Sequence, residues 1–357
     1  MPVTGKRCKW HRVARALRLL CWVGCFSAAA ATRGNEWTRL SPIPNAQGLA
    51  GAFAGVSSGV LLVGGGTNFP NDGAAAAGNK VWYRDVYVLE SPNARWRTVG
   101  KLPRRLAYGV SASYRNRIVC VGGSDERQHF AEAFQLELRN GVLVTTALPR
   151  LPHSLANACG AMVGSRLLIA GGIDEPGSTQ ASNSVLSIDL SEAQPRWKTE
   201  ESLPGSGRIL SIAAGNESSF WVFGGARLVA GKNGKPQRNY LRDAYQYDLG
   251  KGWKQIAELP RAAVAAPSPA PWFEDSIYVL GGDDGTQIDV PVAEHRGFSR
   301  MSFRYDPSGG KWFEAGGLPA PRVTTPCVKW GDSWIVPSGE ERPTIRSPEV
   351  WSWTPAK

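Results

Sequence analysis

The chain has 357 residues, of which 42% are hydrophobic and 20% are charged, so it is long enough for one large domain or two medium ones. This balance excludes an intrinsically disordered chain, which would have fewer apolar residues. The net charge of +11 would favour an acidic partner such as nucleic acid, but six of the positive charges lie in the first 18 residues. Without that segment the formal balance is +5, so a nucleic-acid-binding function loses its main support.

Residues 1–31 have the pattern of a secretory signal peptide. A basic start without acidic residues precedes an apolar run, Leu19–Phe26, and then a stretch of small residues, Ser27–Ala31. A membrane anchor would need ~20 apolar residues, and this run is shorter. A lipoprotein would use Cys25, but Trp22 fits a lipidation signal poorly. We therefore expect cleavage at the end of the small-residue stretch, export to the periplasm or the medium, and no attachment to a membrane afterwards.

One pattern is repeated six times over residues 35–357. In each copy a short apolar run ends in a doublet that contains glycine, and the doublets recur every 49–57 residues. They are Gly65-Gly66, Gly122-Gly123, Gly171-Gly172, Gly224-Gly225, Gly281-Gly282 and Ser338-Gly339. Most copies continue with an aromatic or acidic strand and close with a Trp strand followed by Leu-Pro. This order resembles the kelch repeat and predicts an all-β fold, a six-bladed kelch-type β-propeller with four strands per blade.

The two ends of the repeat region complement each other. Residues Trp37–Pro44 match a closing Trp strand with no blade before them, whereas the last copy stops after its third strand, Glu349–Thr354. We expect the N-terminal strand to complete the C-terminal blade, because this pairing removes two exposed sheet edges at once.

Neither cysteine nor histidine forms a recognisable metal or cofactor motif. The cysteines after residue 31 lie in apolar runs without CxxC spacing, which predicts buried free thiols and leaves one disulfide open as an alternative; they are Cys120, Cys159 and Cys327. The histidines after residue 31 are scattered, at His129, His153 and His295. We therefore expect no metal and no cofactor. The string Gly55–Gly59 fits the G-x-S-x-G pattern of serine hydrolases but spans a predicted strand-to-strand turn, so a hairpin is favoured.

Arginines recur in the Leu-Pro connections between the predicted blades. Five of the six connections carry them, at Arg104 and Arg105, Arg150, Arg208, Arg261 and Arg322. These connections should open on the same face as the loops after the doublets, so a ring of guanidinium groups would suit a small anionic ligand. The alternative is that such arginines bridge blades. Long connections over 67–82, 226–241 and 283–299 are expected to shape a pocket on that face, whereas Asp283–Gly285 is predicted to be a loop tip without chemistry.

The sixth copy places two carboxylates directly after its doublet. Glu340 and Glu341 follow Gly339, and Arg342 and Arg346 lie two to six residues further on. One interpretation is a surface ion pair, and the other is a general base beside an anion clamp. If the extended backbone continues, Glu341 points to the opposite side from Glu340.

Several segments resemble a known family of sugar isomerases. Gly48–Ser57, Leu61–Pro70 and Arg105–Ser111 resemble the N-acetylneuraminate epimerases, which are bacterial sialic acid mutarotases. Gly339–Arg346 is similar to that family's Gly-Glu-x-[basic]-Pro-x-x-Arg segment. The resemblance implies that Glu340 is the proton-accepting base and that Arg346 is the nearby arginine.

The resemblance also implies a function. It implies a cofactor-free enzyme that interconverts the α and β anomers of N-acetylneuraminate, with a small acidic sugar as its partner, and substrate contacts from Asn68, Arg105, Tyr108, Arg208 and Arg300. The order of the blades differs from that of the better-known members, so the chain resembles a circularly permuted branch. Two other functions stay open: a non-catalytic kelch module, and a mutarotase or binder for a different acidic sugar. Neither composition nor motif indicates an oligomeric state.

Overall fold

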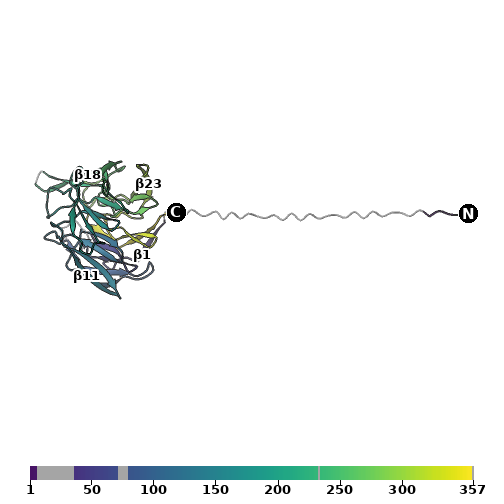
Figure 1. The fold of residues 1–357 in the computed structure, drawn as a ribbon, viewed down its shortest axis with the longest axis horizontal. Coiled ribbons are helices and arrows are strands. Elements are labelled where there is room, and N and C mark those ends of the chain that lie inside the picture. The colour runs from purple at the N-terminus through teal and green to yellow at the C-terminus, as the bar shows by residue number, and fades with distance from the viewer. Residues whose placement is uncertain (6–35, 71–78, 232–233, 356–357) are drawn as a thin grey trace.

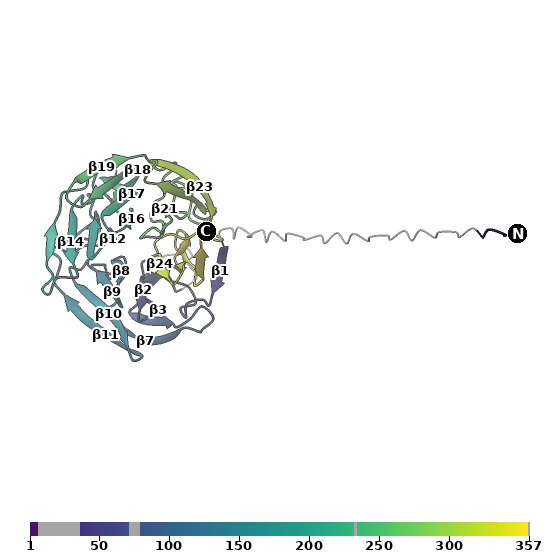
Figure 2. The same ribbon diagram turned by 45° about the vertical axis from the view of Figure 1, so that its right-hand side comes forward.

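The computed structural model describes residues 1–5, 36–70, 79–231 and 234–355, and residues 6–31 of the predicted signal peptide lie outside them. Within the described part, six four-stranded antiparallel sheets form the blades of a β-propeller (Figures 1 and 2). This confirms the predicted all-β, six-bladed fold. No helix in these residues is long and apolar enough to cross a membrane.

The blades follow one another along the chain, and the last one is completed by the first strand. Blade 1 contains β2 (Phe53–Ser57), β3 (Val60–Gly64), β6 (Asp85–Leu89) and β7 (Arg97–Lys101). Blade 2 contains β8 (Val110–Tyr114), β9 (Arg117–Val121), β10 (Ala133–Arg139) and β11 (Val142–Leu148). Blade 3 contains β12 (Cys159–Val163), β13 (Arg166–Ala170), β14 (Val185–Asp189) and β15 (Trp197–Thr199).

The second half of the propeller has the same plan. Blade 4 contains β16 (Ile212–Gly215), β17 (Ser219–Ala230), β18 (Pro236–Asp248) and β19 (Gly252–Ile256). Blade 5 contains β20 (Trp272–Phe273), β21 (Ser276–Val279), β22 (Met301–Asp306) and β23 (Lys311–Gly317). Blade 6 contains β24 (Val328–Trp330), β25 (Ser333–Pro337), β28 (Val350–Thr354) and β1 (Glu36–Leu40). Figure 2 shows β7, β11, β19, β23 and β1 at the outer rim of the ring.

Two short hairpins extend from the blades on either side of the closure. In blade 1, β4 (Thr67–Asn68) pairs with β5 (Val81–Trp82), and in blade 6, β26 (Glu340–Arg342) pairs with β27 (Ile345–Arg346). Both hairpins begin directly after a doublet. They therefore carry the residues that follow the doublets out of the blades and toward one face of the propeller.

The repeated doublets mark turns that require positive φ at both positions. Every doublet residue has φ between 50° and 117°, a region that glycine enters without steric cost. A Cβ on Gly122 would lie 2.3 Å from the carbonyl oxygen of Leu155, at the start of the next blade. Ser338 takes this place in blade 6, where its hydroxyl accepts the Leu49 N–H at 2.7 Å and donates to the Ser347 carbonyl at 2.6 Å. These hydrogen bonds compensate for the absence of glycine in the sixth doublet.

The repeated tryptophans tie neighbouring blades together. Four indole N–H groups donate to a carbonyl that lies just beyond the outer strand of the preceding blade, at 2.7–3.0 Å. The pairs are Trp96 with Ser41, Trp197 with Pro149, Trp253 with Glu201, and Trp312 with Ala257. Each tryptophan thus buries apolar surface, while its indole N–H is hydrogen-bonded to the preceding blade.

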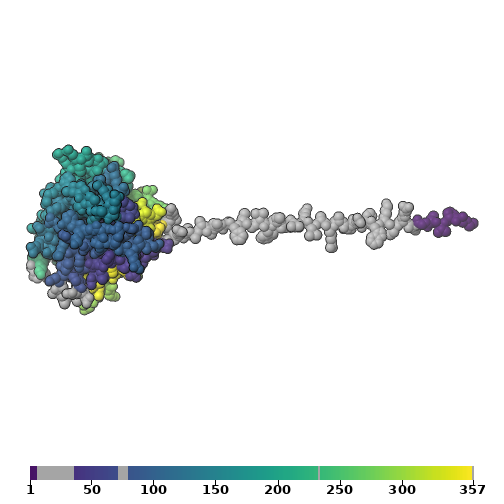
Figure 3. Space-filling model, turned by 90° about the horizontal axis from the view of Figure 1, so that it is seen from below, coloured from purple at the N-terminus to yellow at the C-terminus, as the bar shows by residue number. Residues whose placement is uncertain are grey.

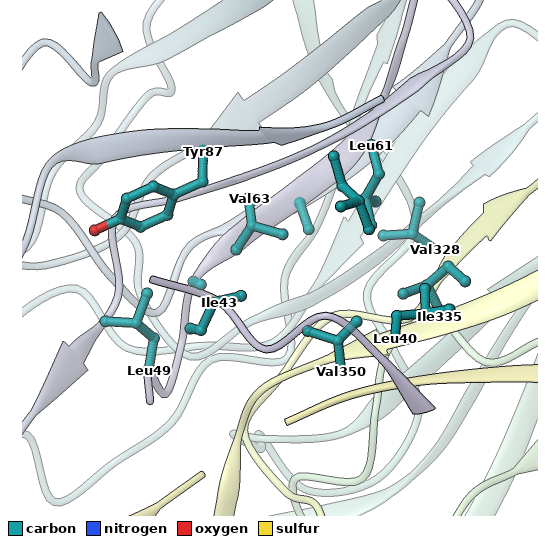
Figure 4. Packing of buried hydrophobic residues seen from close by; sticks show 12 residues of the cluster. Leu40, Ile43, Leu49, Leu61, Val63, Tyr87, Val328, Ile335 and Val350 are labelled. Atoms are coloured by element: carbon teal, nitrogen blue, oxygen red, sulfur yellow. The ribbon is translucent and has the colours of Figure 1, made fainter. Parts of the chain in front are cut away.

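The N-terminal strand closes the ring as predicted. β1 pairs with β28 over its whole length, with Trp37 opposite Trp353, and the two indoles stack with their centroids 6.0 Å apart. Figure 3 shows purple residues of the propeller body next to yellow residues from the C-terminal part of the chain. Leu40 packs with Leu61, Val350 and other apolar side chains from blades 1 and 6, as Figure 4 shows.

Two smaller predictions are also confirmed. The Gly55–Gly59 string is the hairpin between β2 and β3, and the buried Ser57 hydroxyl donates to the carbonyl of Asn116. The three cysteines of the described propeller are free and buried, at Cys120, Cys159 and Cys327. Burial raises the pKa of all three thiols, that of Cys159 to about 12, which makes them poor nucleophiles.

Deletion of residues 35–44 is expected to open the edge of β28 and to remove the apolar contacts of Leu40. Because a domain is held by only ~5–15 kcal/mol, the loss of one strand should consume much of that stability and expose a sheet edge that promotes association. Thermal unfolding and size-exclusion chromatography would check this. A deleted protein that melts at the wild-type temperature and stays monodisperse would contradict the role of β1 in closure.

Candidate functional site

A closed ring of backbone hydrogen bonds surrounds the axis of the propeller, with one residue from the start of each blade. Each N–H donates to the carbonyl of the equivalent residue in the preceding blade, at 2.7–2.9 Å. The members of this backbone ring are Gly51, Tyr108, Asn157, Leu210, Ala265 and Thr324. All six have φ between 54° and 64°, and each non-glycine member pays about 1–3 kcal/mol for that conformation. The ring is therefore a strained element that the surrounding blades hold in place.

A cavity of about 700 Å³ lies on one side of the backbone ring, and a narrower one of about 80 Å³ lies on the other. The ring separates them, since Tyr108, Asn157, Leu210, Ala265 and Thr324 line both. The narrow cavity continues along the axis between small residues from the inner strands. The larger volume suits a small-molecule ligand, so we take the larger cavity as the candidate site and call it the mouth cavity.

The three long connections predicted to shape a pocket all reach the mouth cavity. The blade 1 hairpin contributes Phe69, Lys80 and Trp82, and residues 283–298 form another part of the wall. The connection over 226–241 contributes Arg238 and Tyr240, but it is not the loop that the sequence predicted. β17 and β18 continue through it as a paired hairpin, with Ala230 opposite Pro236.

Glu340 lies in the mouth cavity, next to the backbone ring. Its N–H and carbonyl bond both to Val323, the residue before Thr324 of the ring, at 2.9 Å each. The carboxylate is 16% exposed, and its Oε1 lies 3.1 Å from Nη2 of Arg346. Thr324 Oγ1 donates to Oε2 at 3.4 Å, and the Thr344 N–H donates to Oε1 at 3.3 Å. The predicted base is thus held beside the predicted arginine, with an edge open to the cavity.

Arg346 has donors that no described residue satisfies. Its side chain is 4% exposed and lines the cavity, and the ring of Phe69 lies 4.6 Å from its guanidinium carbon. Nη2 bonds to Glu340, whereas the buried Nε and Nη1 find no acceptor among the described residues. Buried donors of this kind are costly unless a ligand meets them. The arrangement therefore favours an anionic or carbonyl-bearing ligand.

Glu341 points away from the cavity, as the extended pattern predicted. Its Oε1 accepts a hydrogen bond from Nη1 of Arg322 at 2.7 Å, and Nη2 of the same arginine bonds to Glu349 at 2.8 Å. The Arg322 side chain is fully buried. Glu341 therefore helps to hold blade 6 together and does not face a ligand.

The predicted ring of arginines around the mouth is wrong in its geometry. Arg208 is buried and forms a two-pronged ion pair with Asp243, with both N···O distances at 2.8 Å. Arg261 donates to backbone carbonyls, and Arg104 and Arg150 share the carboxylate of Glu132. Since none of these arginines lines the mouth cavity, they act as bridges within the scaffold, which is the alternative that the sequence left open.

Of the other predicted substrate contacts, one lines the mouth cavity and the rest lie outside it. Tyr108 lines the cavity as a member of the backbone ring, and its hydroxyl hydrogen-bonds to Thr67 at 2.7 Å. Asn68 is fully buried and is bonded within blade 1 to Gly48 and other groups. Arg105 is exposed outside the cavity, and Arg300 donates to a carbonyl at the rim. Of the predicted binding residues, the structure brings only Tyr108 together with Glu340 and Arg346.

Sequence reasoning missed three further carboxylates that line the described part of the cavity, Asp125, Glu126 and Asp283. Asp283 follows its doublet as Glu340 does, and it bonds to Val264 in the same way. It accepts a hydrogen bond from the hydroxyl of Tyr240. Burial, together with the negative charge of Asp283, raises the pKa of Tyr240, which stays protonated at neutral pH. The shared position after a glycine doublet was the signal that could have identified Asp283 as more than a loop tip.

Within the described residues no group of His, Cys, Asp and Glu is arranged to hold a metal ion. The histidines of the cavity, His129 and His295, are not clustered with carboxylates in this way. Burial lowers the pKa of His129, so its imidazole is neutral at neutral pH. The polar side chains in the described part of the mouth cavity therefore include carboxylates, phenols, imidazoles and cationic groups.

Fold and site together define a six-bladed β-propeller with a carboxylate–guanidinium pair in a cavity at one mouth. The solved structure of YjhT matches it with a TM-score of 0.65 and 14% sequence identity, covering 87% of this chain and 96% of that one, which shows the same fold. Residues 27–144 match the family model of N-acetylneuraminate epimerase. The resemblance seen in the sequence is confirmed for this segment.

Individual relatives match a similar length. N-acetylneuraminate epimerase of Salmonella arizonae is 45% identical over 102 residues, which is 25% of this chain and 26% of the relative. N-acetylneuraminate epimerase of Haemophilus influenzae strain PittEE is 38% identical over 108 residues, which is 26% of this chain and 28% of the relative. The chain thus spans little more than a quarter of the length of the relatives that it matches. The family model covers blades 1 and 2 and does not extend to Glu340.

Arg208→Leu is expected to reduce stability and not ligand affinity. The substitution leaves Asp243 without its partner, which typically costs about 3–5 kcal/mol for a buried pair. Urea denaturation would measure the loss, and calorimetry with N-acetylneuraminate would measure binding. Arg105→Leu is the matched control, because Arg105 is exposed and should change neither quantity. If the Arg208→Leu protein is as stable as the wild type but no longer binds N-acetylneuraminate, Arg208 contacts the ligand and this interpretation is wrong.

Proposed function

We propose that this protein is a mutarotase that interconverts the α and β anomers of N-acetylneuraminate, with Glu340 as its base. The observation that carries the proposal is the Glu340 carboxylate in the mouth cavity, beside Arg346 with its unmet donors. A sugar acid with its carboxylate on the anomeric carbon needs such a combination of base and cation. The similarity of residues 27–144 to N-acetylneuraminate epimerases supports the choice of sugar.

The proposed reaction moves one proton and one bond. Glu340 takes the proton of the anomeric hydroxyl, the bond from the anomeric carbon to the ring oxygen breaks, and its electron pair goes to the ring oxygen. The same carboxyl group returns its proton to that oxygen, which it reaches because both oxygens are attached to one carbon. Rotation of the open-chain carbonyl and the reverse steps give the other anomer. Atoms and charge balance without a metal or an organic cofactor.

The surroundings of Glu340 suit this role. The guanidinium of Arg346 and the N–H of Thr344 both contact Oε1, while Oε2 meets only the more distant hydroxyl of Thr324 among the groups described above. One carboxylate oxygen is thus fixed, and the other is more available to a substrate hydroxyl. The cavity walls hold the open-chain intermediate in position during the rotation, so that ring closure competes with release.

Glu340→Gln is expected to lower the rate of anomer exchange by ~10²–10⁴-fold, because the amide keeps the shape of the side chain but cannot accept the proton. Exchange would be measured by NMR, starting from freshly dissolved α-N-acetylneuraminate. Glu341→Gln is the control, since Glu341 faces Arg322, and it should change stability more than rate. A Glu340→Gln enzyme with wild-type exchange, or an inactive but folded Glu341→Gln enzyme, would show that the base is misassigned.

The same measurement separates the alternatives. A wild-type protein that binds N-acetylneuraminate but leaves the uncatalysed exchange unchanged would be a binding module. A protein that accelerates exchange of another acidic sugar and not of N-acetylneuraminate would be a mutarotase of different specificity. Only catalysed exchange of N-acetylneuraminate supports the function proposed here.

We also propose that the protein is exported and works outside the cytoplasm after removal of residues 1–31. The basic start, the apolar run and the alanine-rich stretch support this, and an exported mutarotase would act on sugar released outside the cell before its uptake. Intact-mass measurement of soluble protein from the producing cells should give a chain that begins close to Thr32. Soluble protein that still carries residues 1–31 would contradict export by cleavage.

A further inference from the structure

The mouth cavity contains a cation that the sequence did not indicate. Three basic side chains other than histidine line the described part of the cavity, Lys80, Arg238 and Arg346. Arg346 forms an ion pair with Glu340, and Arg238 lies near Tyr240, where its charge opposes the rise that burial and Asp283 cause in the pKa of that phenol. Lys80 and Arg238, unlike Arg346, form no ion pair with a carboxylate of the described residues, and of the two only the Lys80 ammonium lies over aromatic rings. Among the described residues, the positive charge of Lys80 therefore has no carboxylate partner.

Two aromatic rings hold the ammonium group of Lys80 in place. Its Nζ lies 4.3 Å from the centroid of the Tyr108 ring and 4.9 Å from that of Trp82. Tyr108 is fixed by the backbone ring and by its hydrogen bond to Thr67. Cation–π contacts position a charge without cancelling it and without occupying its N–H donors. Trp82 adds a buried indole N–H that finds no acceptor among the described residues.

The blade 1 hairpin places Lys80 close to the proposed catalytic pair. In the β4–β5 ladder, Thr67 is opposite Trp82 and Asn68 is opposite Val81, so Phe69 and Lys80 are the next residues on either side. Directly opposed residues project to the same face, and both line the mouth cavity. Phe69 lies against Arg346, which bonds to Glu340. The two strands of this hairpin therefore bring Phe69, with its contact to Arg346, and Lys80 to the same cavity.

We propose that Lys80 binds the carboxylate of the substrate and thereby sets a preference for acidic sugars, an inference that rests on the proposed function. The carboxylate of N-acetylneuraminate is attached to the same carbon as the hydroxyl that gives its proton to Glu340. The group that binds it must therefore lie near the base without being bonded to it. Lys80 meets this condition, and the indole N–H of Trp82 supplies a second donor for the same anion.

The test compares N-acetylneuraminate with its methyl ester, which differs by one methyl group and lacks the negative charge. By calorimetry, the wild-type protein should bind the acid more tightly than the ester. Lys80→Met is expected to lower affinity for the acid about 10- to 100-fold, since hydrogen bonds to charged groups have this worth, and to leave affinity for the ester nearly unchanged. Lys329→Met is the matched control, because it removes the same charge beside a cavity that does not share the mouth.

The outcomes separate this inference from the proposed function. If Lys80→Met keeps the wild-type preference for the acid, as Lys329→Met should, Lys80 is not the anion-binding group, whatever the exchange rate. If the wild-type protein binds the acid but does not accelerate exchange, the mutarotase proposal fails, and the comparison of acid and ester still decides the role of Lys80. A wild-type protein that binds acid and ester equally would overturn the inference as well. Thermal unfolding of both variants, and Lys80→Gln as a second neutral substitution, exclude misfolding as the cause.

Discussion

The backbone ring at the axis is the constraint on which the rest of the molecule depends. Each of its hydrogen bonds joins two neighbouring blades, and the one from Gly51 to Thr324 joins the first blade to the last. No blade can move toward or away from the axis without stretching two of them. The non-glycine members adopt a conformation that is unfavourable by itself, so the ring persists only because six blades support it together. Residues of the ring also line the mouth cavity. Closure of the propeller therefore also fixes the positions of the groups that face a ligand.

Outside the ring, some polar side chains bridge strands and blades of the scaffold, whereas others face the mouth cavity. Tryptophans and buried arginines bridge sheets at the periphery, where their partners are carbonyls and carboxylates of the protein itself. Glu340 and Glu341 show the division most clearly, since adjacent residues of one strand face opposite ways. One carboxylate lies in the cavity beside Arg346, and the other neutralises Arg322. A basic residue in this fold is thus informative about ligands when the described residues leave its donors or its charge without a partner, as they do for Arg346 and Lys80.

Much of the fold could be predicted because its signals are local. Glycine readily adopts positive φ, so the turns at the doublets could be predicted from the doublets themselves. The unmatched strand around Trp37 could be recognised from its own residues. The position of Glu340 followed from the same repeat. The partners of the arginines could not be predicted, because Asp243 lies 35 residues from Arg208 and no pattern links them. Lys80 belongs to no repeated position, and only the packing of its hairpin reveals its neighbours.

The pairing of β1 with β28 has a consequence for how the protein is made. A chain emerging from the ribosome can form blades 1 to 5 in turn, but the strand that ends at Thr354 is the last to become available, and β1 has no partner until then. Until β28 is available, β1 is therefore an unpaired segment next to blade 1, and neither the backbone ring nor the mouth cavity is complete. The backbone ring and the mouth cavity are therefore completed in the same step, when β1 pairs with β28.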